Sequence, residues 1–360
     1  MMLTASIPGR TVHANGKEYL YFGGTAYLGL PTHPGFQELV IKNIRRWGTA
    51  YGSSRNANVQ ISAYQEAESA LSELVGSEAA LTLSSGMLAG KLAVEALSTP
   101  GMRFFYFPGC HPAIMTPGAE PFYQNSEMHP DLLTDTAEEI TLLTDAIPSM
   151  QVVPIDLSDI TKISPAKKIT LLVDESHSLG IVNQNGRGIL AALDLPGLHL
   201  PALKRKILVA SLGKAYGLTG GVIASDQDFI SQVKETACFI AGAGMNPAFA
   251  QSFCEGKAIF TQQLQLLREN TGFLYGQLPL QAKNDLLYDA AYPVIYPQAD
   301  ACHEELLQDD IVITHFQYPS SRKIMNRIVL SAHHTPEDLD RLAGSLTRRE
   351  PLTRRVAPDG

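Results

Sequence analysis

Apolar residues recur at helical spacing in several segments of the first hundred residues. Residues 34–47 place on one face a set of large apolar side chains, namely Phe36, Leu39, Val40 and Ile44. Residues 62–75 repeat this spacing, with Ser62 placed to cap a helix and Gly76 to end it. Residues 87–97 predict a further helix. The pattern therefore predicts amphipathic helices that pack one face against a core.

Short aliphatic runs follow these helices, and each ends in small or polar residues. The run 79–83 is followed by Ser84-Ser85-Gly86, the run 171–173 by Asp174 and then His177, and the run 207–210 by Ser211 and then Lys214. Strand and helix signals alternate in this way to about residue 265. The alternation predicts an α/β fold with a mostly parallel, doubly wound sheet and helices on both faces.

The pattern changes near residue 267, and the chain divides accordingly. Strands are predicted at 293–296, 310–316 and 326–332, a helix at 300–308, and a last helix capped by Thr335 with Pro336 at its first position. Residues 1–30 look extended, with turns at Asn15-Gly16 and Gly23-Gly24. We expect an arm and first helix at 1–45, a large domain at 46–265, a smaller α+β domain at 266–347 and a tail at 348–360.

Composition narrows the class of protein. The chain has 360 residues, 45% of them hydrophobic and 18% charged, with a net charge of -8. This acidic balance argues against nucleic acid or an anionic membrane as partner, and no apolar window is long enough for a bilayer. The start lacks a signal-peptide pattern, and the four cysteines lack metal-ligand spacing, so we expect reduced thiols, no metal site and a cytoplasmic protein.

The polar residues at the strand ends match the three demands of pyridoxal 5′-phosphate (PLP). Its phosphate needs N–H donors and a helix dipole, which the turn Ser84-Ser85-Gly86-Met87 before a helix supplies. Its ring nitrogen needs a facing carboxylate, and Asp174 fits that role. Its aldehyde needs an amine, for which Lys214 is suited, with Ser211 one helical turn away for the phosphate. The carboxyl ends of parallel strands bring such groups together.

Each of these features has a structural interpretation when taken alone. A strand that ends in aspartate is common in α/β proteins, a lone His177 is typical of a core or cap histidine, and Cys110 beside His111 is more typical of a small buried residue than of a nucleophile. Gly213-Lys214 is not a phosphate-binding loop, because Leu208 and Ala215 stand where that motif needs glycine and a hydroxyl residue. The order of the features along the chain favours the PLP interpretation.

The sequence resembles the α-oxoamine synthases, fold-type I PLP enzymes of the aminotransferase class I/II superfamily that include 8-amino-7-oxononanoate synthase and 2-amino-3-ketobutyrate coenzyme A ligase. The segments that carry the resemblance are Tyr27-Leu28-Gly29-Leu30, Ser84-Ser85-Gly86-Met87-Leu88-Ala89, Val173-Asp174-Glu175-Ser176-His177-Ser178-Leu179-Gly180, Gly186-Arg187-Gly188, Ser211-Leu212-Gly213-Lys214-Ala215-Tyr216-Gly217, and Arg327 ahead of His334. The resemblance covers most of the chain and is most specific between residues 173 and 217.

The resemblance implies a role for each site residue. Lys214 would hold PLP covalently and act as the general base, Asp174 would pair with the ring nitrogen, and His177 would bond the ring oxygen. Ser211 and the turn Ser85, Gly86 and Met87 would hold the phosphate, His111 would stack on the ring, and Arg327 would bind the substrate carboxylate. The resemblance also implies a homodimer with shared active sites that condenses a small α-amino acid with an acyl-thioester.

Several segments depart from the family pattern and leave alternatives open. The segments 58–61 and 241–247 differ, and the family's Thr-Glu-Ser…Ser-Met-Asp-Gly-Asp block has no evident counterpart, since 151–157 stands near that place. The acyl donor could therefore be coenzyme A or a carrier-protein thioester. An aminotransferase on the same fold is the main alternative, which the histidine three residues after Asp174 disfavours. A non-catalytic relative used for binding is disfavoured by the retained Lys214, Asp174, His177 and Ser211.

Overall fold

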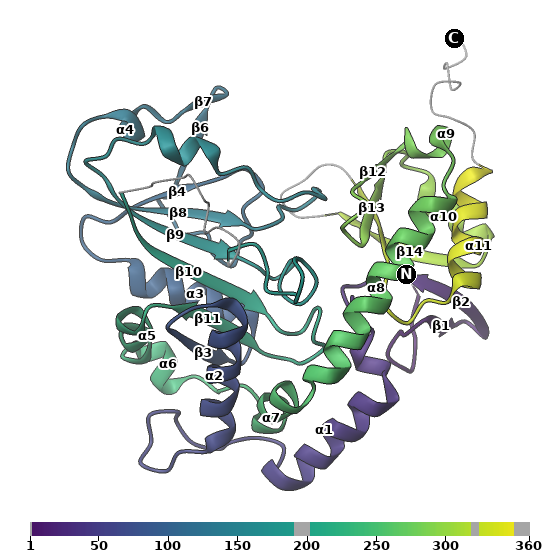
Figure 1. Ribbon diagram of the computed structural model, residues 1–360, viewed down its shortest axis with the longest axis horizontal. Helices are drawn as coiled ribbons and strands as arrows, with labels where there is room; N and C mark the ends of the chain where they lie inside the picture. The colour runs from purple at the N-terminus through teal and green to yellow at the C-terminus, as the bar shows by residue number, and fades with distance from the viewer. Residues whose placement is uncertain (1, 191–201, 318–323, 349–360) are drawn as a thin grey trace. The chain divides into compact units, whose positions relative to one another are not determined.

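The chain folds into two compact units, which Figure 1 shows as a ribbon. The computed structural model describes residues 2–190, 202–317 and 324–348, so most of the expected tail lies outside the described residues. One unit comprises Met1–Gln37 and Ile259–Gly360, and the other comprises Glu38–Ala258. The N-terminal arm thus belongs to the same unit as the C-terminal part of the chain.

The unit of residues 38–258 is built on a seven-stranded sheet of order β3-β11-β10-β9-β8-β4-β5. Its strands are β3 (Ala79–Leu83), β4 (Arg103–Tyr106), β5 (Glu120–Pro121), β8 (Glu139–Asp145), β9 (Lys168–Asp174), β10 (Leu203–Ser211) and β11 (Gly221–Ser225). Neighbours from β10 to β5 pair in parallel, whereas β11 is antiparallel to both β10 and β3. A mostly parallel sheet was predicted, and this topology confirms it.

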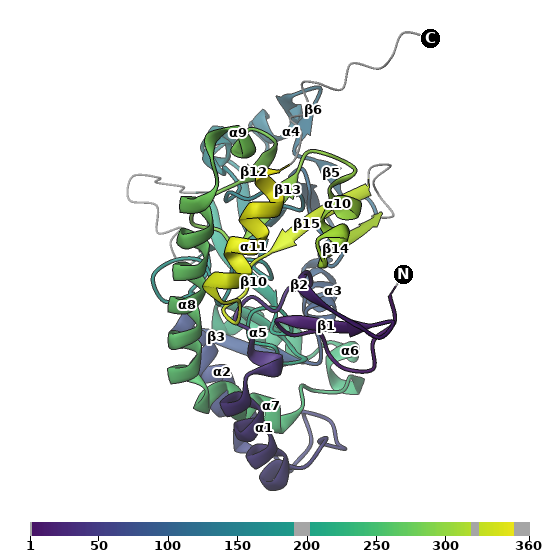
Figure 2. The ribbon, with the colours of Figure 1, turned by 90° about the vertical axis from the view of Figure 1, so that its right-hand side faces the viewer.

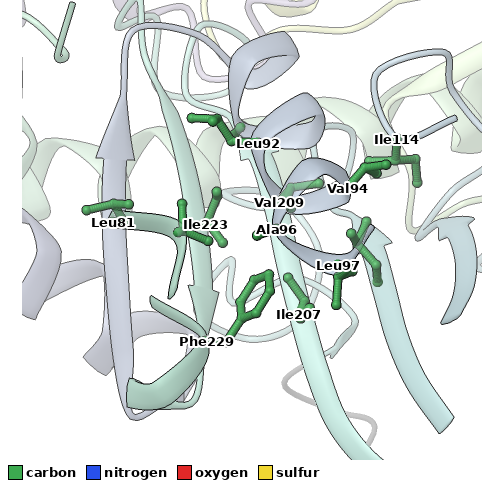
Figure 3. Close-up of a cluster of buried hydrophobic side chains, with 14 of the residues drawn as sticks. Leu81, Leu92, Val94, Ala96, Leu97, Ile114, Ile207, Val209, Ile223 and Phe229 are labelled. Atoms are coloured by element: carbon green, nitrogen blue, oxygen red, sulfur yellow. The ribbon is translucent and has the colours of Figure 1, made fainter. Parts of the chain in front are cut away.

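Helices pack on this sheet through an aliphatic core. Strand residues such as Leu81, Ile207, Val209 and Ile223 meet Leu92 of α3 (Gly86–Leu97) and Phe229 of α5 (Gln227–Lys234), as Figure 3 shows. The unit's further elements are α2 (Ser62–Val75), α3 (Gly86–Leu97), β6 (Tyr123–Gln124), β7 (Glu127–Met128), α4 (Pro130–Leu133), η2 (Ser158–Lys162), α5 (Gln227–Lys234), α6 (Ala237–Ala241) and α7 (Pro247–Glu255). Burial on both faces explains why its strands read as continuous apolar runs.

The unit of residues 1–37 and 259–360 contains a six-stranded sheet of order β1-β2-β14-β15-β13-β12. Its strands are β1 (Thr11–Ala14), β2 (Lys17–Phe22), β12 (Leu286–Tyr288), β13 (Val294–Pro297), β14 (Ile311–Gln317) and β15 (Ile324–Val329). Asn15 and Gly16, both with positive φ, form the predicted two-residue turn between β1 and β2. Strand β2 then pairs in parallel with β14, which ties the N-terminal arm into this sheet.

Two helices of this unit lie close to their predicted positions: α10 (Cys302–Gln308), which packs on β14 (Figure 2), and α11 (Pro336–Thr347), which Thr335 caps as predicted. The unit also contains η1 (Leu30–Thr32) and α9 (Leu280–Lys283), which were not predicted. Helices α1 (Pro34–Trp47) and α8 (Lys257–Gln277) cross the boundary between the units. The predicted bounds of α1 and α2 are confirmed.

One predicted cap is wrong. Ser62 is the first residue of α2 and not its cap, because Ile61 has the extended backbone of the cap position and offers no side-chain oxygen. The stop at Gly76 is confirmed: its left-handed backbone, with φ of 70°, ends the helix at little steric cost. The four cysteines are free thiols.

Candidate active site

Three parallel strands end side by side at one edge of the large sheet and bring acids together there. Asp145 at the end of β8 is the register partner of Asp174 at the end of β9, and Val209 near the end of β10 is the next partner across. Both residues are buried, with exposed fractions of 3% for Asp145 and 6% for Asp174. The predicted position of Asp174 at a strand end is therefore observed, with a second acid beside it.

Ser176 links Asp174 to the lysine segment. Its backbone N–H donates to Oδ1 of Asp174 over 2.8 Å, and its hydroxyl oxygen accepts from the N–H of Ser211 over 2.8 Å. Ser176 is itself buried. The acid and the start of the lysine turn are thus held in a fixed relation by one small side chain.

Glu175 closes the loop that carries His177. Its buried carboxylate accepts from the backbone N–H of Ile189 over 2.8 Å, and also from the backbone of Leu190 and the hydroxyl of Ser178. Burial raises the pKa of this carboxyl, an effect that the hydrogen bond from Ser178 opposes. Gly188 has φ of 80°, and a Cβ there would lie 2.5 Å from Oε2 of Glu175. The loop that positions the half-buried His177 therefore depends on a buried acid and on a glycine.

Lys214 lies in the tight turn between β10 and β11. The N–H of Leu212 donates to the carbonyl of Gly220 over 3.0 Å, and the N–H of Leu218 donates back to Leu212 over 3.1 Å. Within the turn the hydroxyl of Ser211 accepts from the N–H of Gly213 over 3.3 Å. Lys214 is half-buried at the tip of this closed turn, one residue beyond the exposed Gly213.

The turn before α3 lies against the end of β10. The hydroxyl of Ser85 caps α3 by accepting from the N–H of Leu88 over 3.2 Å. A Cβ on Gly86 would lie 2.7 Å from the Cα of Ser211. The backbone segments at residues 86 and 211 therefore approach so closely that only glycine fits at position 86. Met87 follows with half of its surface exposed. A helix N-terminus with free N–H groups therefore stands beside Ser211, which suits an anion.

His111 follows β4 and faces the same strand ends. Its backbone N–H donates to Oδ1 of Asp145 over 2.8 Å, and its Nδ1 accepts from the N–H of Ala113 over 3.1 Å. Burial lowers the pKa of the imidazole, the negative charge of Asp174 opposes this, and the positive charge of Lys214 adds to it. The ring thus lies within electrostatic range of both residues. Burial also raises the pKa of the neighbouring Cys110 thiol, which supports the structural interpretation of that cysteine.

Arg327 lies on β15 in the other unit and has an unusual environment. Its guanidinium donates to the carbonyl of Gly24 over 3.2 Å and bonds the hydroxyl of Tyr296, and its Nε is buried without a hydrogen-bond partner. Tyr27 also faces it, and burial raises the pKa of that hydroxyl to about 12. Within the described ranges no carboxylate forms an ion pair with Arg327. A buried cation that lacks a negative partner is suited to bind an anion.

Sequence reasoning missed Asp145, Ser176 and Glu175. The signal for Asp145 was present, because Leu142, Leu143 and Thr144 precede it much as the aliphatic run precedes Asp174.

One further acidic cluster lies away from these strand ends. Glu120, His129 and Asp131 place ligand atoms within 4.8 Å of one another. Arg103 contacts two of the three residues, with its Nη2 2.6 Å from Glu120 and 2.8 Å from Asp131. These two acids thus already share an arginine of the fold as their ionic partner. No helix of the described residues is long and apolar enough to span a bilayer.

Comparison with known proteins places the chain in a family. The sequence matches the family Aminotransferase class I and II over residues 18–346, so the chain belongs to that family. It is 26% identical to 8-amino-7-oxononanoate synthase of Fervidobacterium nodosum, covering 92% of this chain and 88% of the relative. It is likewise 26% identical to serine palmitoyltransferase of Sphingobacterium spiritivorum, covering 94% and 88%.

The fold also matches solved structures over nearly its whole length. A structure of SPT with PLP superposes with a TM-score of 0.79 at 19% identity, covering 96% of this chain and 91% of the other. The predicted fold class, that of the fold-type I PLP-dependent transferases, is thereby confirmed. The family membership also confirms the resemblance stated from the sequence.

Proposed function

We propose that this protein is a PLP-dependent acyltransferase of the α-oxoamine synthase type, which condenses a small α-amino acid with an acyl-thioester. The observation that carries the proposal is the meeting of Asp174, Ser211, Lys214 and the Gly86 turn at one edge of the large sheet. Relatives named 8-amino-7-oxononanoate synthase and serine palmitoyltransferase, which match nearly the whole chain, support the same reaction class.

The strand-end residues fit the chemical groups of PLP. A dianionic phosphate suits the N-terminus of α3, where Ser85, Gly86 and Met87 present backbone N–H groups beside the hydroxyl of Ser211. A protonated ring nitrogen suits the buried Asp174, which receives one hydrogen bond from the backbone of Ser176. The aldehyde suits Lys214. When bound, PLP supplies an electron sink that stabilises negative charge at the amino acid α-carbon.

The protein's own residues then divide the remaining work. Lys214 would take the proton from the α-carbon of the amino acid, and its half-buried position keeps that amine close to the site. His111 would stack on the ring, and because its pKa is lowered by burial the imidazole is neutral near pH 7 and adds no positive charge beside Lys214. His177 bonds the ring oxygen from the loop that Glu175 closes.

Arg327 is the carboxylate-binding residue of this proposal. Its guanidinium is buried among tyrosine hydroxyls, keeps one N–H without a partner and has no acid beside it in the part of the chain that the structure describes. Because the free energy of burying the guanidinium is offset only in part by neutral oxygens, an amino acid carboxylate is the natural counter-ion. The planar guanidinium of arginine can also form two parallel hydrogen bonds to a carboxylate, so it orients that group better than a lysine ammonium would.

Replacement of Arg327 by alanine should weaken amino acid binding by about tenfold to a hundredfold, since a charge-assisted contact is worth about 1.5–3 kcal/mol. The measurement is the amino acid concentration that half-saturates the change in the visible absorbance of bound PLP. The absorbance without amino acid should not change. Arg341→Ala, which removes an exposed arginine of the same unit, is the matched control. Unchanged affinity in Arg327→Ala would place the carboxylate elsewhere.

Addition of an amino acid and then an acyl-thioester distinguishes condensation from transamination. We expect glycine, alanine or serine to change the absorbance of bound PLP, and an acyl-thioester to deepen or consume that change with release of free thiol. Coenzyme A and carrier-protein thioesters should be tested in parallel, because the family's Ser-Met-Asp-Gly-Asp block has no evident counterpart here and residues 151–157 stand near its place. Conversion of the cofactor to its amine form, with recovery on addition of a keto acid and no thiol release, would support the aminotransferase alternative instead.

The assembly, location and partners of the protein are also part of the proposal. The family resemblance supports a homodimer in the cytoplasm with an active site shared between subunits. The net charge of -8 supports small molecules, and not nucleic acid, as partners. The domains proposed from the sequence, with the PLP site in 46–265 and Arg327 in 266–347, place the cofactor and carboxylate functions on different parts of the chain.

A further inference from the structure

Asp145 is a buried titratable group at the proposed site that none of the roles above uses. We propose that Asp145 is a positioning residue: it fixes the backbone of His111, and it forms with Asp174 a carboxyl pair that holds one proton until a positive charge faces Asp174. This inference rests on the proposed PLP function. It adds a source for the proton that the ring nitrogen must carry.

The geometry of the two strands supports a pair. Strands β8 and β9 are parallel and in register from Glu139↔Lys168 to Asp145↔Asp174 without a break. Register partners on adjacent parallel strands project to the same face of a sheet. Both side chains are buried, and each already accepts one backbone N–H, from His111 in one case and from Ser176 in the other. The two carboxyls are thus neighbours that share little water.

The charges around the pair favour a single negative charge. Asp145 faces Asp174 on β9, the N–H of His111 and the Cys110 thiol on the segment after β4, and Lys214 after β10. Burial raises the pKa of Asp145 well above its usual value, and Asp174 adds to this, whereas the His111 N–H and Lys214 oppose it. Two buried carboxyls side by side resist double ionisation, and their protons belong to the pair as a unit.

The pair can then supply the proton of the ring nitrogen. In the protein without cofactor, one of the two carboxyls carries an O–H. When PLP is bound, that O–H bond breaks and an N–H bond forms at the ring nitrogen, which leaves two carboxylates facing one cation. The proton moves within the site, so the step requires no proton from solvent. In Asp145→Asn the side chain at position 145 cannot ionise, so Asp174 is already charged and the ring proton must arrive with the cofactor or from solvent.

Asp145→Asn separates the two parts of the inference. The asparagine oxygen can still accept from His111, but the side chain can no longer hold or release a proton. We expect PLP binding to Asp145→Asn to take up about one proton more per site than binding to the wild type. The measurement is calorimetry of PLP binding near pH 7 in buffers of different ionisation enthalpy. Asp145→Ala should in addition bind PLP about two- to tenfold more weakly than Asp145→Asn, because it loses the His111 contact.

The protein without cofactor gives an independent readout. A folded-state pKa above the unfolded value of about 3.9 means that the folded protein holds more protons, so stability falls as pH rises through the folded pKa. The melting temperature of the wild type should therefore fall as the pH rises from the unfolded pKa to the folded pKa of the pair. In Asp145→Asn this pH-dependent fall in melting temperature should be absent. Asp174→Asn should lose it too, since either replacement breaks the pair. This second variant keeps the test decisive if Asp145→Asn does not fold.

The outcomes distinguish this inference from the proposed function. Equal proton uptake by the wild type and Asp145→Asn, or an unchanged pH dependence of melting in both single variants, overturns the carboxyl pair. Asp145→Glu, which restores an ionisable group, should return proton uptake toward the wild-type value. Failure of the wild type to bind PLP would instead overturn the proposed function itself.

Discussion

Lys214→Ala should abolish covalent attachment of PLP and lower turnover by about 10²- to 10⁴-fold or more, the range associated with loss of a positioned general base. The reason is that the turn after β10 presents this amine beside Ser211 and within electrostatic range of His111 and Asp145. Absorbance spectra should show PLP bound without the shift that its link to a lysine produces, and activity assays with amino acid and acyl-thioester should show the loss.

Lys168→Ala is the matched control for this variant. Lys168 is an exposed lysine at the amino end of β9, and its contact with Glu139 is long, at 3.4 Å. Its replacement should leave the spectrum and the turnover unchanged. Full activity in Lys214→Ala, or an equal loss in both variants, would contradict the role given to Lys214.

Asp174→Asn should keep the fold and bind PLP weakly, yet lose most exchange of the amino acid α-proton with solvent. An amide cannot hold the ring proton by charge, so the cofactor withdraws electrons less effectively. Loss of one charge-assisted contact alone predicts that PLP binds on the order of tenfold to a hundredfold more weakly. Proton exchange can be followed by NMR in deuterated water with glycine or alanine as the amino acid.

The control for Asp174→Asn is Asp228→Asn, which removes an exposed acid from α5 in the same unit. It should exchange at the wild-type rate. Near-normal exchange in Asp174→Asn would mean that another acid faces the ring nitrogen, and Asp145 is the carboxyl nearest in register.

Local patterns predicted local structure well. The apolar spacing of residues 34–47 and 62–75 matches the bounds of α1 and α2, and Asn15-Gly16 marks the β1–β2 turn. These features depend on neighbours a few residues apart, which the sequence displays directly. The position of Asp174 at a strand end was predictable for the same reason, because the aliphatic run before it is continuous.

Strand order was the main information that the sequence did not contain. Asp145 matters because β8 lies beside β9, and Ser176 matters because it reaches the end of β10. Glu175 bonds the backbone of residues 189 and 190, which only the folded loop brings near. Likewise, β2 pairs with β14 nearly three hundred residues later, so composition along the chain gave no sign that the N-terminal arm shares a sheet with the C-terminal part.

The most direct test of the account is to locate the lysine that carries the cofactor. The protein would be purified with PLP, reduced with borohydride, digested and mapped by mass spectrometry. We expect a pyridoxyl group on Lys214, in the peptide that continues from Ser211-Leu212-Gly213. A label on a different lysine, or no label on a protein that binds PLP, would contradict it.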